Sequence, residues 1–420
     1  MKQGFYKSLL KKIKFIGSGE GNSMAPIIYP KDGLYIEPAL INQLKVNDIV
    51  SFQQKKKFIT HRIIYKKQNY IITKGDNNLQ IDGKIYPSQI IGKVQQIKRS
   101  EQIINLESLY LVQSTVYFQE IVKIKNAFEK ENINFVFLKG LPLHLYYEKT
   151  HPRRIYADCD VLIDEECFQK AEKIINKFGY KKTEKKNKQV ENNYLKNVNG
   201  FNVIFDLHLE PAFLMTQFSG LEALYPQKFI NELTEELLKN KKKVKINNEF
   251  FFILDTKYLI LFLALHLFHH NFRGTFRLDF LNKVIRKNRL STSNWQKITS
   301  IINNYQLGNF VYPVFILLQR HYQPPIPDSF LKSIKPNFTN FKNLNIFDDE
   351  SRTEAGINRF KLIFTLSPEP LWKKLLIFLN PAVFWSITWV IWKKLFSFFS
   401  NQKLIQQDLF VFFLLLLGIF

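Results

Sequence analysis

Residues 158–163 read Asp-Cys-Asp-Val-Leu-Ile, and this run decides how the larger part of the chain folds. Its apolar character predicts a buried β-strand that begins with two carboxylates. Alternate residues of a strand project from the same face, so Asp158 and Asp160 lie on one side while Cys159 points into the core. The run therefore predicts a strand that presents two carboxylates to one cation.

The segments around this strand alternate between strand and helix patterns. The expected elements, in chain order, are a strand at 133–138, a helix at 141–148, the strand at 158–163, a helix at 165–178, an antiparallel pair ending at 201–207, and helices at 256–270 and 278–286. Apolar side chains at helical spacing over 105–131 precede them. We therefore expect a mixed α/β domain at residues 101–370 that ends in a helical extension.

A third carboxylate ends a second predicted strand. The run Phe205-Asp206-Leu207-His208 places Asp206 and His208 on one face by the same alternation. Mg²⁺ prefers oxygen ligands, and three carboxylates on neighbouring strand ends are what a phosphoryl or nucleotidyl transfer site requires. An Asp-x-Asp pair by itself is also typical of a solvated strand end. Whether the pair belongs to a metal site therefore has to be judged from the neighbouring motifs.

Residues that suit phosphate binding lie just upstream. Lys139 and Gly140 stand between the strand at 133–138 and the helix at 141–148. A glycine there lets the backbone approach a phosphate, and the helix N-terminus favours the negative charge. Lys139 adds a positive charge, and Arg153 or Arg154 can add another.

The ordered set of these motifs resembles the uncharacterised nucleotidyltransferase family of the polymerase-β superfamily. The resemblance covers about residues 105–380 and implies that Asp158, Asp160 and Asp206 bind Mg²⁺, with a nucleoside triphosphate as substrate. Lys139 and Gly140 stand where better-known relatives carry Gly-Ser, and with Arg154 they are the expected nucleotide-binding residues. The later run His266…His269-His270…Arg277-Leu278-Asp279 also resembles the helical part of that family, although His266 is more typical of a packed core histidine.

The first hundred residues have a different pattern. Residues 20–98 read as short strands separated by Gly, Pro, Asn and Asp, with strands expected at 33–37, 48–52, 58–65, 69–74 and 90–97. This predicts a small all-β domain at residues 1–100, joined to the next domain by a short link at 98–102. The predicted fold class is therefore α+β and multidomain.

The β domain contains the residue types that an activated serine nucleophile requires. They are Ser23 in Gly-Asn-Ser-Met-Ala-Pro (21–26), His61 in Thr-His-Arg (60–62), Asp76 in Lys-Gly-Asp-Asn-Asn (74–78), and Asp82. A serine hydroxyl needs an adjacent base to take its proton, and neutral imidazole suits that task near pH 7. A carboxylate can then fix the imidazole tautomer.

This order of motifs resembles the signal peptidase I superfamily, in the branch that uses His where the common bacterial enzymes use Lys. The resemblance implies Ser23 as nucleophile, His61 as general base, Asp82 as the orienting carboxylate and Asp76 in a supporting turn. It also implies the Ser23 N–H as an oxyanion donor, and no cofactor. The sequence departs from that branch because no transmembrane helix precedes the serine. A degenerate β domain that does not cleave is the alternative.

The charge balance limits the choice of partners. Lys and Arg total 60 against 36 Asp and Glu, a net charge of +24. Nucleotide phosphates, nucleic acid and an anionic membrane surface would all suit that charge. No Arg-rich arm or aromatic-basic RNA-binding motif is found, which disfavours nucleic acid. The two cysteines, Cys159 and Cys167, have no metal-ligand spacing, and residues 1–18 form neither signal peptide nor anchor, so a cytoplasmic location is expected.

The C-terminal segment, residues 371–420, is strongly apolar. Residues 375–392 carry no charge and are flanked by lysine pairs, and residues 409–420 are a second apolar run. Two interpretations remain: packed helices of the transferase domain, or a membrane-associated tail that binds an anionic surface.

The two halves together predict a bifunctional protein. The first domain would be a serine endopeptidase acting on a peptide or preprotein, and the second would transfer a nucleoside monophosphate to an unknown acceptor. The alternatives are a peptide-binding β domain attached to the transferase, or a membrane-associated maturation or assembly factor.

Overall fold

A computed structural model of the 420-residue chain describes residues 15–18, 20–78, 80–156, 158–183, 191–211, 223–336, 344–347 and 352–379, and positions 381, 384 and 388. The chain forms two compact units. The larger comprises Met1–Met215 and Lys228–Leu362, and the smaller comprises Thr216–Gln227 and Ile363–Phe420. Both predicted functional sites lie in the larger unit.

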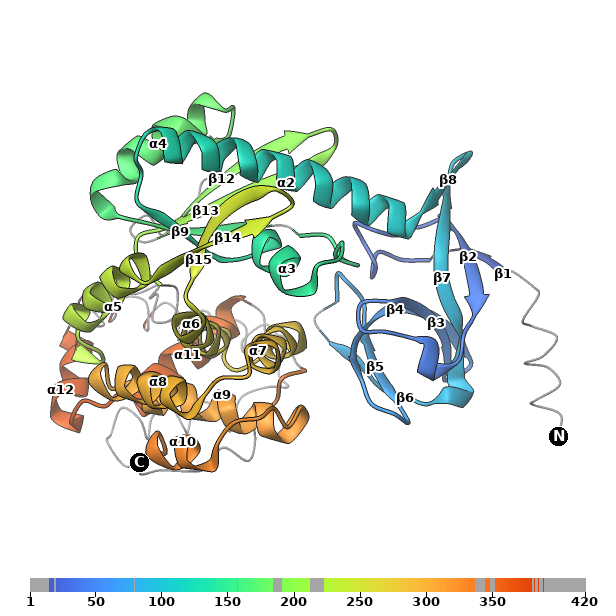
Figure 1. Ribbon diagram of the computed structural model, residues 1–420. Coiled ribbons are helices and arrows are strands. Elements are labelled where there is room, and N and C mark those ends of the chain that lie inside the picture. Colours follow the sequence, from blue (N-terminus) through green and yellow to red (C-terminus); the bar gives the residue numbers. More distant parts are fainter. Residues whose placement is uncertain are drawn as a thin grey trace. The chain divides into compact units, whose positions relative to one another are not determined.

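The N-terminal part of the larger unit is an eight-stranded sheet (Figure 1). Its strands are β1 (Phe15–Ser18), β2 (Gly33–Pro38), β3 (Ile49–Gln54), β4 (Lys57–Lys66), β5 (Ile71–Lys74), β6 (Ile81–Ile85), β7 (Ile90–Arg99) and β8 (Gln102–Asn105). The order is β1-β2-β7-β3-β4-β5-β6, with β8 paired to β7. Two clusters of buried apolar side chains form the core of this part. One contains Met24, Leu34 and Val94, and the other contains Val50 and Phe52. The five strands predicted from alternation and turn residues are confirmed.

The predicted link at 98–102 is wrong. The chain turns at Ser100, where φ is +53°, and continues as β8 antiparallel to β7. Helix α2 begins directly afterwards, because the Asn105 side chain accepts hydrogen bonds from the Glu107 and Ser108 backbone N–H groups and caps the helix. The sheet is therefore joined to the following helix without a linker.

The second sheet has seven strands in the order β11-β12-β13-β10-β9-β15-β14. They are β9 (Phe135–Lys139), β10 (Asp158–Ile163), β11 (Lys181–Lys182), β12 (Glu191–Val198), β13 (Phe201–His208), β14 (Lys241–Ile246) and β15 (Glu249–Leu254). The central strand β10 is parallel to β13 and antiparallel to β9. Strand β10 is buried from Cys159 to Ile163, as its apolar sequence predicts.

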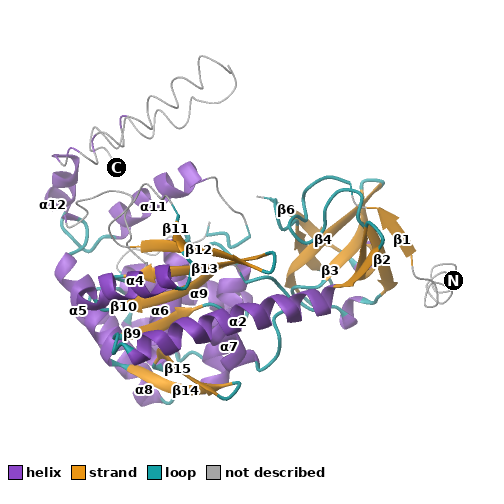
Figure 2. Cartoon of the chain, turned by 90° about the horizontal axis from the view of Figure 1, so that it is seen from above, coloured by secondary structure: helices purple, strands orange, loops and turns teal. Residues whose placement is uncertain are grey.

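Helices lie on both sides of this sheet (Figure 2). On one face are α2 (Leu106–Lys130) and α4 (Phe168–Lys177), and the Tyr117 hydroxyl of α2 donates to the Ile204 carbonyl of β13 at 2.9 Å. The short helix α3 (Leu141–Glu148) follows β9, and α5 (Gln227–Lys239) precedes β14. The predicted helices at 105–131 and 141–148 are confirmed, which places Lys139 and Gly140 at the junction of β9 and α3.

The rest of the larger unit is helical. It contains α6 (Thr256–His269), α7 (Thr275–Asn288), α8 (Thr292–Asn304), α9 (Gly308–His321), α10 (Asp328–Ser333) and most of α11 (Arg352–Leu366). Helix α6 is buried from Tyr258 to Phe268, because it is apolar on every side and its neighbours enclose it. This core helix brings the C-terminal helices against the end of the sheet that carries the carboxylates.

The smaller unit contains α12 (Leu371–Leu375) and a 3₁₀ turn at Leu376–Leu379. The Ser367 hydroxyl donates to the Leu224 carbonyl at 2.5 Å and joins the two segments of this unit. Among the described helices, none combines the length and apolar character needed to cross a bilayer. Most of the predicted apolar tail, including residues 409–420, lies outside the described residues.

Candidate active sites

The pairing of two parallel strands creates the carboxylate site. In the register of β10 with β13, Asp160 is the partner of Asp206, and Leu162 is the partner of His208. Asp160, Asp206 and His208 therefore project from the same face, and each offers a ligand atom within 4.8 Å of the others. All three residues are buried. His208 Nε2 lies 3.0 Å from Asp160 Oδ1, which draws the two strand ends together.

The ligand set of this cluster suits a divalent cation. Two carboxylates and one imidazole nitrogen are ligands that proteins use for such ions. The Asp160 side chain is buried, and its Oδ2 is paired with the Lys139 ammonium at 2.6 Å. Asp160, Asp206 and His208 would hold the ion.

Asp158, the other predicted carboxylate ligand, pairs with Lys139 in this structure. Its side chain is 45% exposed, and its Oδ2 lies 3.3 Å from Lys139 Nζ, outside the cluster of Asp160, Asp206 and His208. His208 stands in the cluster instead. Its place on the Asp206 face followed from strand alternation, but nothing in the sequence distinguished it as a ligand from a packed histidine.

Lys139 is the counter-ion of this site. Its Nζ lies 2.6 Å from Asp160 Oδ2 and 3.3 Å from Asp158 Oδ2. Burial opposes the charge of both partners, but the two carboxylates raise the pKa of Lys139 above its usual value. In turn, the Lys139 charge and the His208 hydrogen bond outweigh burial and hold the pKa of Asp160 below its usual value. The charged forms of lysine and carboxylate are therefore the stable ones here.

Gly140 is required by the backbone at this point. It caps α3 with φ +99° and ψ −159°, a conformation that residues with a side chain avoid. A Cβ at this position would lie 3.0 Å from the Asp158 carbonyl oxygen. Gly140 thus allows β9 to turn into α3 directly beside β10, which keeps Lys139 next to the two aspartates.

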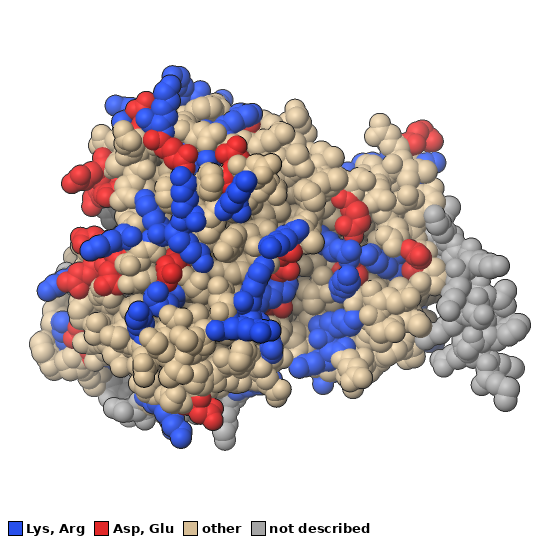
Figure 3. All heavy atoms as spheres, in the orientation of Figure 1, with Lys and Arg blue, Asp and Glu red and all other residues tan. Residues whose placement is uncertain are grey.

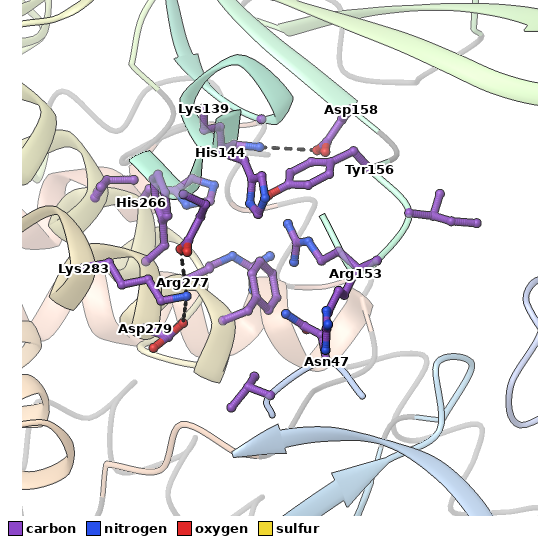
Figure 4. Close-up of a pocket in the computed structure, with 18 residues that line it drawn as sticks. Asn47, Lys139, His144, Arg153, Tyr156, Asp158, His266, Arg277, Asp279 and Lys283 are labelled. Carbon is purple, nitrogen blue, oxygen red and sulfur yellow. Dashed lines mark hydrogen bonds and ion pairs between the residues drawn. The ribbon is translucent and has the colours of Figure 1, made fainter. Parts of the chain in front are cut away.

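A pocket of about 300 Å³ opens beside Asp158 (Figure 4). Lys139, His144, Tyr156 and Arg277 surround it, and Val46 and Asn47, from the loop before β3, complete its wall. Lys283, on α7, is held by Glu148 at 2.8 Å and Asp279 at 3.0 Å. Asp279 thus lies at the pocket, as a member of this ion-pair group.

Two neighbouring arginines have different surroundings. The Arg153 guanidinium is bound by Asp48 at 3.0 Å and lies 3.5 Å from Glu107, so it is neutralised. Arg154 stacks on aromatic rings, with its guanidinium carbon 4.4 Å from the centre of Tyr156 and 4.7 Å from that of Phe276. Of the two, Arg154 is the one whose charge is left for a ligand.

Three histidines near the end of α6 lie against this pocket. His266, His269 and His270 form a ring cluster with centroid separations of 4.7–6.3 Å, and His266 lines the pocket. Burial lowers the pKa of each well below its usual value, and the positive charges of Lys139 and Arg277 lower it further. The cluster is therefore neutral at pH 7, so Lys139, Arg154 and Arg277 supply the positive charge facing the carboxylates.

A second constellation lies in the N-terminal sheet. His61 Nε2 is 3.0 Å from Ser23 Oγ, and His61 Nδ1 is 2.7 Å from Asp82 Oδ2. A carboxylate accepts the Nδ1–H, which leaves Nε2 to accept the serine proton. The strands β4, β5 and β6 are neighbours, so Thr73 of β5 also reaches Asp82 and donates to it at 2.7 Å. Sequence reasoning did not identify Thr73.

Asp76 supports this constellation from outside. Its two carboxylate oxygens each accept a 2.7 Å hydrogen bond from Arg62, the residue after His61. In the same turn, the Asn77 N–H donates to the Ser23 carbonyl at 2.8 Å, and a Cβ on Gly75 would lie 2.6 Å from that oxygen. The Gly-Asp-Asn turn therefore positions the serine backbone, while Asp76 itself does not contact Ser23 or His61 among the described contacts.

A cavity of about 810 Å³ lies beside Ser23. Its floor is apolar, with Met24, Ile28, Leu34 and Ile36 among the lining residues, and His61 lies at its wall. The hydrogen-bonded Ser23–His61 pair therefore lies beside a largely apolar cavity.

The sheet carrying Asp160, Asp206 and His208, with its phosphate-suited junction, defines a nucleotidyltransferase. The match of a family model confirms this class: the chain belongs to the uncharacterised nucleotidyltransferase family, whose model covers residues 107–323. No protein of curated function matches the chain. The comparisons give no support to the signal-peptidase resemblance of residues 20–98.

Two solved structures are similar to parts of the chain. One is the antibiotic-resistance factor ANT(2'')-Ia, with 12% identity and a TM-score of 0.31 over 50% of this chain and 98% of that one. The other is an antigenic nucleotidyltransferase-like protein from Paracoccidioides brasiliensis, with 13% identity and a TM-score of 0.32 over 54% and 93% of the two chains. These low scores add nothing to the family match.

Proposed function

We propose that this nucleotidyltransferase transfers a nucleoside monophosphate from a nucleoside triphosphate to a hydroxyl group of an acceptor. The observation that supports this is that Lys139, which lines the pocket with Arg154 and Arg277, pairs at 2.6 Å with Asp160 of the cluster Asp160–Asp206–His208. In the proposed reaction the acceptor oxygen forms a bond to the α-phosphorus, the α–β phosphoanhydride bond breaks, and pyrophosphate leaves with that electron pair. The acceptor proton passes to a carboxylate or to water.

Each group of residues in the site has a separate role in the proposed reaction. Asp160, Asp206 and His208 would hold a divalent cation, for which Mg²⁺ is the expected ion and which would neutralise phosphate charge when bound. Lys139 keeps Asp160 ionised, which is the form of the carboxylate that binds a cation. Arg154 lines the pocket, fixed between two aromatic rings, and would contact the phosphates.

The experiment is a transfer assay with ATP, CTP, GTP and UTP, each labelled at the α-phosphate, and a cell extract as the source of acceptor. Wild type should label an acceptor, and Asp206→Asn should reduce labelling by at least about 100-fold. Asp328→Asn, at the start of α10 and outside the pocket, is the matched control and should behave as wild type. Equal labelling by wild type and Asp206→Asn would remove the carboxylate cluster from the reaction.

A second activity is proposed for the N-terminal sheet because Ser23, His61 and Asp82 have the geometry of a catalytic triad. His61 would take the Ser23 proton as the oxygen attacks a peptide carbonyl, and would then give it to the leaving amine. Asp82 would hold the imidazole in the required tautomer, with Thr73 fixing Asp82. The substrate would be a peptide lying along the apolar cavity.

Labelling with a fluorophosphonate probe tests the nucleophile without knowledge of the peptide. Wild type should form a covalent adduct at Ser23, and Ser23→Ala should form none. Ser18→Ala, which lines the same cavity, is the control and should be labelled as wild type is. If neither wild type nor Ser18→Ala reacts, and no candidate peptide is cleaved, the β domain binds peptides at most.

A further inference from the structure

The turn between α6 and α7 places one arginine in an unusual position. After α6 the backbone passes through positive φ angles at Asn271 (+55°), Phe272 (+61°) and Gly274 (+107°). The turn is fixed by backbone hydrogen bonds, including that from the Gly274 N–H to the Ile346 carbonyl at 2.9 Å. Helix α7 then begins at Thr275, so Arg277 lies in its first turn and faces the pocket.

Gly274 makes room for the guanidinium of Arg277. A Cβ at position 274 would lie 2.5 Å from Arg277 Nη1 and 3.5 Å from its Cδ. The absence of a side chain therefore lets the arginine fold back over the start of its own helix. Any larger residue at position 274 would push the guanidinium out of this place.

The Arg277 guanidinium is not neutralised in the way that Lys139, Lys283 and Arg153 are. Its Nε atom is buried and has no hydrogen-bond partner among the described residues. Its carbon lies 4.4 Å from the centre of the Phe276 ring, on which Arg154 also stacks at 4.7 Å. By contrast, Lys139 is held by two aspartates, and Lys283 by Asp279 and Glu148.

Two guanidinium groups beside one aromatic ring repel each other unless an anion lies between them. Burial and the charge of Arg154 lower the pKa of Arg277 to about 10, and Asp158 and Asp160 only partly oppose this. The arginine therefore remains charged at pH 7 at a cost in energy. A multiply charged anion that accepts hydrogen bonds from both groups would relieve that cost.

We infer that Arg277 is a substrate-binding residue that, with Arg154, holds the β- and γ-phosphates of the nucleoside triphosphate, and that Gly274 positions it. The inference rests on the proposed transfer reaction and names the residue that binds the leaving pyrophosphate. The α-phosphate would lie toward the carboxylates, and the polyphosphate tail would lie over Phe276. Arg277 would then favour triphosphates over monophosphates.

Equilibrium binding to the full-length protein tests this without measuring catalysis. The probes are ATP, inorganic tripolyphosphate and AMP, measured by calorimetry in the presence of a chelator. Arg277→Gln should weaken the binding of ATP and tripolyphosphate by about 10- to 100-fold and should leave AMP binding within about twofold. Arg277→Lys, which keeps the charge but loses the planar fork, should give an intermediate loss.

Two further variants separate this role from an effect on folding. Gly274→Ala keeps the arginine but displaces it, so it should also lose affinity for tripolyphosphate more than for AMP. Arg286→Gln removes the same charge from the exposed last turn of α7, outside the pocket, and should bind all three probes as wild type does. Thermal unfolding of each variant confirms that it is folded.

The outcomes are distinct. If wild type binds no nucleotide and transfers none, the proposed function fails and the role of Arg277 falls with it. If wild type binds ATP but Arg277→Gln, Arg277→Lys and Gly274→Ala bind tripolyphosphate equally well, the inference is wrong while the transferase proposal stands. A loss that is equal for ATP and AMP would also overturn it, since it would place Arg277 away from the β- and γ-phosphates.

Discussion

Lys139 links the sequence motif to the chemistry of the transferase site. Its ammonium lies against Asp160 and Asp158, so it balances their charge. A divalent cation entering the cluster of Asp160, Asp206 and His208 would compete with the ammonium for Asp160 Oδ2. Lys139 and Gly140 stand where better-known relatives carry Gly-Ser. The lysine at this position neutralises the carboxylates of Asp158 and Asp160.

The three histidines at the end of α6 give a prediction at the scale of single residues. His266, His269 and His270 have pKa values well below 6.5 in the folded protein, whereas an unfolded histidine titrates near 6.5. Below about pH 6.5 the unfolded state therefore binds more protons, and the free energy of unfolding falls by about 1.4 kcal/mol per pH unit for each histidine. Denaturant unfolding between pH 7 and 5 should show this loss. His269→Gln should reduce the slope by about one fifth, because His144 and His321, whose pKa values are lowered to about 4, contribute as well. An unchanged slope in that variant would show that His269 is charged in the folded state.

Gly140 gives a second prediction. Replacing it by alanine forces a side chain into a conformation with φ +99° and brings Cβ to 3.0 Å from the Asp158 carbonyl. We expect Gly140→Ala to lower the free energy of unfolding by about 1–3 kcal/mol and to displace Lys139. Urea unfolding measures the first effect, and transfer activity should fall along with it. Gly17→Ala, whose Cβ would meet only ordinary contact at 3.9 Å, is the control.

At the scale of elements, the parallel pairing of β10 with β13 brings Asp160, Asp206 and His208 together. Strand alternation in the sequence predicted that Asp158 and Asp160 share a face, and that Asp206 and His208 do too. It could not predict that Asp160 stands opposite Asp206, since strands separated by a helix and two strands are paired by tertiary packing. The same packing directs Asp158 toward Lys139 and leaves His208 in the cluster.

The composition of this cluster predicts its metal preference. An imidazole nitrogen beside two carboxylates suits Mn²⁺ better than an all-oxygen set does, because Mn²⁺ binds nitrogen ligands more readily than Mg²⁺. His208→Ala should therefore weaken Mn²⁺ binding by about 10-fold or more and affect Mg²⁺ binding less. Titration followed by the paramagnetic signal of Mn²⁺ measures this directly, with Mg²⁺ as competitor. Equal Mn²⁺ affinity in wild type and variant would exclude His208 as a ligand.

The N-terminal sheet shows which strands local sequence patterns can predict. Turn residues and alternation were sufficient to predict β2, β3, β4, β5 and β7. They missed β1, β6 and β8. Strand β8 is mostly exposed and is ordered by its pairing to β7. The triad of Ser23, His61 and Asp82 rested on motif resemblance, and the neighbouring strands β4, β5 and β6 bring these side chains into contact.

At the scale of the larger unit, Arg62 joins the N-terminal sheet to the transferase pocket. Its guanidinium binds Asp76 and also donates to the carbonyl groups of Asn47 at 2.8 Å and Arg153 at 3.1 Å. Asn47 and Arg153 both line the pocket, and Arg62 directly follows His61. No local pattern predicts such a contact, because residues 62 and 153 are distant in the sequence.

Removing this link should be costly. Arg62→Ala leaves the Asp76 carboxylate and several carbonyl groups without their partner, and we expect a loss of about 3–5 kcal/mol in the free energy of unfolding. Lys98→Ala removes a lysine whose ion pair with Glu101 is exposed, and should change stability by less than about 0.5 kcal/mol. A small effect of Arg62→Ala would mean that water replaces these hydrogen bonds at little cost.

The surface charge is consistent with an anionic substrate. On the face shown in Figure 3, Lys and Arg side chains are widely distributed and acidic side chains form smaller groups. With a net charge of +24, the protein should attract nucleoside triphosphates over long distances, and high salt should weaken this attraction.

The central claim is that the cluster Asp160–Asp206–His208 supports nucleotidyl transfer, and the position of the transferred label tests it most directly. Wild type, Asp160→Asn and Asp328→Asn are each incubated with the same acceptor extract and with triphosphates labelled at either the α- or the γ-phosphate. Wild type and Asp328→Asn should incorporate the α-label and no γ-label, while Asp160→Asn should lose at least about 100-fold of the α-label incorporation. Incorporation of the γ-label, or α-labelling that survives in Asp160→Asn, would contradict the account.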